Sequence, residues 1–249
     1  MSTILNLTLA ELAICEPYSI AIFEKYNIDY YKKGSRTLHE ACMEKGVDDL
    51  LMYKEFSQHE DNPAKDSTAI NYDDLDIERF IDHIETKYHA KEALTLPLLY
   101  DQIKFLKEEQ GHLYPKMVEL KIIFRVMMDE LKDHAAREEK VLFPYIKKMA
   151  DMRKNKTKSL TQISLITNPL RLLEFEHEHT DSEIDTIRSI TDNYFVPDNA
   201  SKEYQLLMEE LSDFQKTFHE HIHLENNILF PKIIELETEL LESIRYNLQ

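Results

Sequence analysis

The chain has 249 residues, enough to bury a core in one large domain, or a large and a small one, without disulfides. Its formal charge of −17, with no clustered Lys/Arg stripe, argues against nucleic acid as a partner. Only 3 glycines are present, whereas strands joined by tight turns need glycine for positive φ. Composition therefore predicts an all-α fold.

Cysteine usage and the N-terminal sequence predict a cytoplasmic protein. Cys15 and Cys42 are too few and too isolated to form a disulfide framework. Acidic residues interrupt the early apolar runs, which is unlike a signal peptide, and no apolar stretch approaches the ~20 residues that span a bilayer. We expect no membrane partner.

The pattern along the chain predicts two domains. Residues 1–60 contain short apolar segments separated by turn signals, which predicts a small helical N-terminal domain. Residues 61–73 are polar and include Pro63, so they are the best linker candidate. From 74 to 249 the pattern changes to long amphipathic helices.

Four long helices are predicted, over 74–109, 114–149, 168–192 and 202–234. Apolar residues recur at steps of three and four in each, so each helix presents one face to a common core, as in a four-helix bundle. The first segment is the least regular, and Pro97 is expected to bend it. The clearest seam belongs to the second segment and consists of Leu120, Phe124, Met127, Leu131, His134, Glu138, Val141 and Tyr145.

Two seams contain a histidine followed four residues later by a glutamate: His134 with Glu138, and His221 with Glu225. At this spacing both side chains project from one helix face, so they can hold one metal ion together, or the carboxylate can bridge two. A buried glutamate is costly unless it is paired, protonated or bound to a metal.

The spacing alone is weak evidence, because such pairs are usually surface interactions. Two observations favour a metal site here. His134 to Pro144 matches His221 to Pro231 at a constant offset of 87 residues, which predicts two helices that present equivalent ligands. Both pairs also replace apolar residues in otherwise apolar seams.

Two histidines and two glutamates do not saturate two metal ions. His89 and His177 lie in the other seams, and His112 precedes the second helix, so these three are the candidates for further ligands. The alternative for each is an ordinary hydrogen-bonded histidine. The remaining histidines, including His179, are expected to face solvent or to support the ligands. Imidazole and carboxylate ligands without thiolate favour iron or manganese, with iron the better choice.

The motifs resemble the hemerythrin-like superfamily, and in particular its di-iron proteins of iron–sulfur cluster repair. The resemblance implies a hemerythrin-like four-helix bundle that holds two non-haem iron ions. It implies that the two glutamates bridge the ions, with an oxo bridge as a further option. The matching stretches are Ile81–Ile84 with Tyr88–His89, Glu130–His134, Phe143–Pro144, Glu174–His177 and His221–Pro231. The implied iron ligands are His89, His112, His134, Glu138, His177, His221 and Glu225.

The function implied by the resemblance is repair of iron–sulfur clusters damaged by nitric oxide or oxidative stress, through supply of iron or electrons. The implied partners are damaged iron–sulfur proteins, and the small gases NO or O2. The same ligands would equally serve an NO reductase or a sensor that binds O2 or NO. A metal-free helical interaction protein is the remaining alternative. Whether the protein is an enzyme, and whether it forms a homodimer, stay open.

The N-terminal sixty residues also resemble the small domain of that family, with one departure. Such proteins usually carry adjacent cysteines after an Asp-Tyr pair. Here Asp29-Tyr30 is followed by Tyr31-Lys32, and neither Cys15 nor Cys42 replaces the missing pair. Any step that needs these thiols is therefore in doubt.

Overall fold

The computed structural model describes residues 2–16, 18–60, 72, 75–155 and 165–246. These residues are mainly helical and contain no β-strand, only an isolated bridge between Thr8 and Thr37, so the all-α prediction is confirmed. No described helix has the length and apolar character needed to cross a bilayer. The predicted linker, 61–73, lies outside the described residues except for Tyr72. The domain boundaries stay a prediction.

The chain divides into two compact units. The first unit contains residues 1–76 with the helical segment His219–Lys232, and the second contains Ile77–Phe218 with Ile233–Gln249. Five short helices form most of the first unit: α1 (Ser2–Leu5), α2 (Leu9–Cys15), α3 (Tyr18–Lys25), α4 (Leu38–Lys45) and α5 (Asp49–Glu60).

Local capping signals begin two of these short helices. The Thr8 hydroxyl accepts the backbone N–H of Glu11, whose carboxylate accepts the N–H of Thr8, and Thr37 and Glu40 repeat this capping box before α4. Each box satisfies backbone donors that a helix start leaves unpaired. Gly46 ends α4 at φ 66°, a left-handed conformation that glycine adopts without strain.

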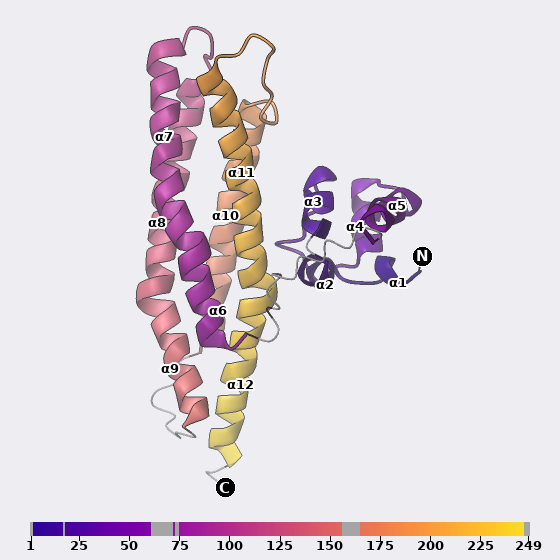
Figure 1. The fold of residues 1–249 in the computed structure, drawn as a ribbon. Helices are drawn as coiled ribbons and strands as arrows, with labels where there is room; N and C mark the ends of the chain where they lie inside the picture. Colours follow the sequence, from indigo (N-terminus) through magenta and orange to yellow (C-terminus); the bar gives the residue numbers. More distant parts are fainter. Residues whose placement is uncertain (1, 17, 61–71, 73–74, 156–164, 247–249) are drawn as a thin grey trace. The chain divides into compact units, whose positions relative to one another are not determined.

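After these short helices, the described residues form four long helical rods, which can be followed in Figure 1. The prediction placed them at 74–109, 114–149, 168–192 and 202–234, and the last rod extends further than predicted. Their parts are α6 (Ile77–Ile84), η1 (Glu85–His89) and α7 (Ala90–Gln110); α8 (Met117–Arg137), η2 (Glu138–Leu142) and α9 (Phe143–Lys154); α10 (Thr167–Ile190); and α11 (Lys202–Leu224), η4 (Glu225–Leu229) and α12 (Phe230–Tyr246). Within the second unit, α8 packs against α7 and α10, and α9 packs against α6.

The predicted apolar seams form the core. Leu120, Phe124, Met127 and Leu131 are buried along α8, and the Phe124 and Phe214 rings meet edge to face at 6.4 Å. The seam prediction is wrong at Val141, which is 68% exposed. The π-helical turn that begins at Glu138 inserts an extra residue, so the buried positions shift by one, to Leu142 and then Ile146.

A π-helical turn interrupts three of the four rods: η1, η2 and η4. In η2 the backbone N–H of Phe143 bonds to the carbonyl of Glu138, and in η4 the N–H of Phe230 bonds to that of Glu225. A proline follows each, Pro144 and Pro231. Because proline has no N–H and clashes with the carbonyl four residues earlier, it disfavours the α-helical bond at this point. π turns occur often at functional sites.

We expect Phe124→Ala to lower the free energy of unfolding by about 3–5 kcal/mol, because it empties a fully buried ring position. Ile122→Ala on the same helix is the control, because Ile122 is 65% exposed and its loss should change stability by about 0.5 kcal/mol or less. Urea denaturation followed by circular dichroism measures both. Equal effects of the two substitutions would contradict the core assignment.

Candidate metal centre

Both predicted His–Glu pairs are buried where a helix meets a π turn. His134 and His221 lie in the last turns of α8 and α11, and Glu138 and Glu225 begin η2 and η4. Each glutamate is 0% exposed. The imidazole Nε2 lies 3.4 Å from a carboxylate oxygen in the first pair and 3.2 Å in the second.

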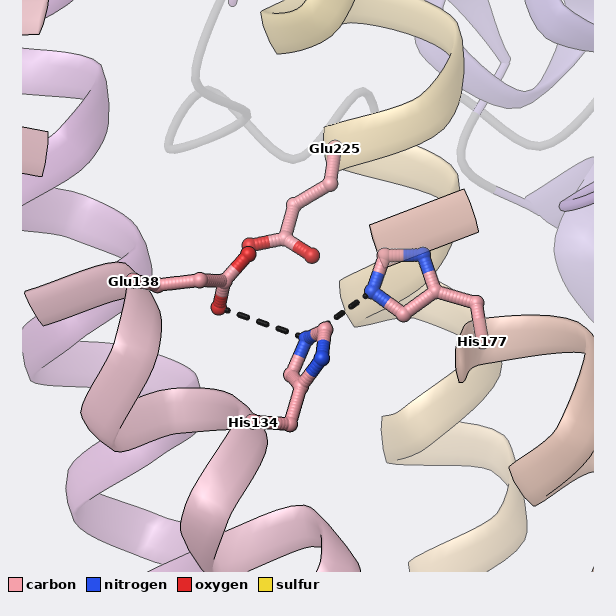
Figure 2. Close-up of side chains that lie close together, drawn as sticks. All are labelled: His134, Glu138, His177 and Glu225. Atoms are coloured by element: carbon pink, nitrogen blue, oxygen red, sulfur yellow. Dashed lines mark hydrogen bonds and ion pairs between the residues drawn. The ribbon is translucent and has the colours of Figure 1, made fainter. Parts of the chain in front are cut away.

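The other two rods contribute one buried histidine each. His89 ends η1, and its Nε2 lies 3.2 Å from Oε2 of Glu138. His177 on α10 places its Nε2 3.1 Å from the Nε2 of His134, as Figure 2 shows. The α11–η4–α12 rod is one continuous helix, so Glu225 sits in its middle.

These side chains form two groups with the spacing of metal ligands. His134, Glu138, His177 and Glu225 each offer one ligand atom within 4.8 Å of the others, and so do His89, His221 and Glu225. Figure 2 draws the four side chains of the first group. Glu225 belongs to both groups, while Glu138 contacts a histidine of each. The two groups therefore share Glu225 and are linked through Glu138.

Two further carboxylates orient the histidine rings. Nδ1 of His134 lies 2.8 Å from Glu176, and Nδ1 of His89 lies 3.0 Å from Glu139. The hydrogen bond from His134, helped by the Arg137 guanidinium, lowers the pKa of Glu176 to about 2. Glu176 is therefore a carboxylate that only accepts, and Nδ1 of His134 must donate. In the neutral ring, Nε2 then carries the lone pair, as a metal ligand requires.

The distances between these imidazole and carboxylate groups fit bound cations better than direct hydrogen bonds. Neither carboxylate oxygen of Glu138 accepts a hydrogen bond among the described residues, although two imidazole Nε2 atoms lie within 3.4 Å of Oε2. Two Nε2 atoms at 3.1 Å, as in His134 and His177, match nitrogens that share one cation at about 2 Å. Burying this carboxylate without a positive charge would cost several kcal/mol.

Six of the seven predicted ligands come together, and His112 does not. His112 is exposed in the turn between α7 and α8. His134 follows the start of α8 by 17 residues, which is about 25 Å of helix, so His112 belongs to the opposite end of that rod. A histidine just before a helix lies near the helix start and cannot reach ligands near its end.

Sequence reasoning missed Glu139 and Glu176. Their only signal was adjacency, because each carboxylate neighbours a ligand in the chain, Glu138 or His177. Among the other histidines, His179 is exposed as expected, whereas His219 and His223 are buried. The Nδ1 of His219 contacts Glu24 at 2.7 Å within the first unit.

The chain is similar to a family of cation-binding domains and to proteins named for iron–sulfur cluster repair. The Hemerythrin HHE cation binding domain matches residues 98–233, more than half of the chain. A Haemophilus influenzae protein named "Probable iron-sulfur cluster repair protein" is 28% identical over 91% of this chain and 96% of its own. The "Iron-sulfur cluster repair protein YtfE" of Dickeya chrysanthemi is 29% identical over 92% of this chain and 97% of its own.

The matched range contains five of the six gathered side chains, the second and third rods in full and parts of the other two, and only His89 lies before it. On this match and this architecture, the chain belongs to the hemerythrin HHE cation-binding family.

Proposed function

We propose that this protein holds two iron ions around Glu138 and Glu225 and supplies iron or electrons to damaged iron–sulfur clusters. The observation that carries the proposal is the pair of buried glutamates surrounded by four buried histidines, in a cation-binding family whose relatives are named for cluster repair. Those names favour repair over NO reduction or gas sensing with the same ligands.

The proposed ligand assignment follows the two groups of side chains. In this assignment His134 and His177 would hold one ion and His89 and His221 the other, and Glu138 and Glu225 would be ligands to both, since each lies near histidines of both groups. Imidazole and carboxylate ligands without thiolate suit iron. When bound, the ions supply exchangeable iron and redox equivalents. His112 has no part in this assignment.

The surrounding residues hold the ligands in place and restrict water. Glu176 and Glu139 fix the ring orientation of His134 and His89, so each Nε2 stays directed at the site. The Phe143 ring stacks on His89 at 5.9 Å and an interplanar angle of 12°. Because Glu138 and Glu225 would contact both ions, their strength as ligands determines how readily iron leaves.

The missing cysteine pair restricts how the repair proceeds. Tyr31 stands directly after Asp29-Tyr30, and its ring stacks on His219 at 3.9 Å. Both cysteines of the chain are free, and burial raises the pKa of the Cys42 thiol to about 11, so it is a poor nucleophile or ligand. We infer that the transfer of iron or electrons to a damaged cluster does not use a pair of thiols in this protein. We also place the protein in the cytoplasm, where free thiols stay reduced.

The orienting role of Glu176 can be tested separately. We expect Glu176→Ala to weaken iron binding by about 10–100-fold, because His134 loses the acceptor that fixes its tautomer. Competition with a chelator, followed by elemental analysis, measures the effect. Glu174→Ala is the control, because Glu174 is exposed on the same helix. Equal iron retention in both variants would contradict the orienting role.

The repair proposal predicts about two iron ions per chain in protein purified from iron-replete cells. We expect this protein to restore the spectrum and activity of a dehydratase whose [4Fe–4S] cluster has been damaged by nitric oxide. Removal of the iron, or His134→Ala, should abolish the effect, because His134 is a proposed ligand. His39→Ala is the control, since His39 is exposed and pairs with Asp49 elsewhere.

An acceptor that gains nothing from protein loaded with two irons would overturn the repair proposal. Turnover of NO by that same loaded protein with an electron donor would then support the gas-reduction alternative. Protein that purifies without iron but with full helicity would overturn the metal assignment itself.

A further inference from the structure

A second group of potential ligands lies on the α8–α10 face. Glu130 of α8, and His179 and Glu183 of α10, each offer one ligand atom within 4.8 Å of the others. His179 and Glu183 are four residues apart, so they project from one face of α10. The Nε2 of His179 lies 3.3 Å from Oε2 of Glu130. None of these residues belongs to the dinuclear cluster.

The ordinary interpretation is an exposed ion pair between Glu130 and His179. Glu183 does not fit it, because this side chain is only 8% exposed and its Oε2 has no hydrogen-bond partner among the residues that the structure describes. A buried carboxylate oxygen without a donor is costly. Burial and repulsion from Glu130 raise the pKa of Glu183 to about 7, against the opposing effect of His179. The group thus combines two acidic side chains with one imidazole.

We propose that Glu130, His179 and Glu183 form a separate, mononuclear site for a divalent transition-metal cation. One imidazole and two carboxylates are ligands that Zn2+, Mn2+ and Fe2+ accept, with water in the remaining positions. A bound cation gives Glu183 the partner it lacks and neutralises its repulsion with Glu130.

The site is accessible from solution. The side chains of Glu130 and His179 are 46% and 53% exposed, so a hydrated cation can reach them without opening the bundle. Both residues also line a pocket of about 250 Å³ that includes His134 of the dinuclear cluster. The surface site therefore lies at a pocket that reaches the buried one, and it is formed entirely by the second compact unit.

Zn2+ binding to the protein as purified tests the proposal, with isothermal titration calorimetry for affinity and elemental analysis for iron retained. We expect one Zn2+ per chain, bound without loss of iron. His179→Ala and Glu183→Gln should each weaken this binding at least tenfold. Glu174→Gln removes one negative charge from the same helix outside the group, so its Zn2+ affinity should stay within twofold of the original.

Circular dichroism confirms that each variant is folded. His179 is exposed and alanine favours helix, so this variant is expected to fold even if Glu183→Gln does not. Identical Zn2+ binding by His179→Ala and the unchanged protein would overturn the proposal, as would the absence of any Zn2+ binding. Neither result bears on cluster repair, because the inference does not depend on that function.

Discussion

Two carboxylates in the middle of an apolar bundle are the constraint on which the rest of this structure depends. Glu138 and Glu225 are fully buried, where an ionised group must be balanced by positive charge at close range. The neighbouring groups are imidazoles rather than lysines or arginines, and at least two of those rings are oriented to present lone pairs. The core is thus suited to bind metal cations rather than to pair its carboxylates with cationic side chains.

The π turns at Glu138 and Glu225 alter the helices at the buried carboxylates themselves. In an uninterrupted α-helix, the seam that carries His134 and Glu138 would continue to Val141 and Tyr145. The π turn instead starts at Glu138 and moves the next buried position to Leu142. The proline that follows favours this change, and the second copy of the motif has the same turn at Glu225. The repeated motif therefore encodes both the buried His–Glu pair and the π turn that begins at its glutamate.

The acidic side chains of this protein differ in how well water solvates them. Most of the acidic side chains that the structure describes are exposed or half-buried, where water solvates their charge. Glu183 is largely buried, and its pKa is raised because burial and repulsion from Glu130 outweigh the favourable effect of His179. Partial burial is what distinguishes this carboxylate from the many exposed ones, and no count of acidic residues could reveal it.

The sequence by itself determined the helical class, the four apolar seams and the two equivalent His–Glu pairs. These follow from local spacing in the sequence, because apolar residues at every third or fourth position define the buried face of a helix. The tertiary structure alone decided which remaining histidines join them: His89 and His177 do, whereas His112 lies at the opposite end of its rod. It also decided the roles of Glu139 and Glu176 and the shift at Val141. The shift at Val141 follows from the π turn at Glu138, which breaks the regular helical period. The other assignments depend on the depth at which each rod lies against its neighbours, and helical period carries no information about depth.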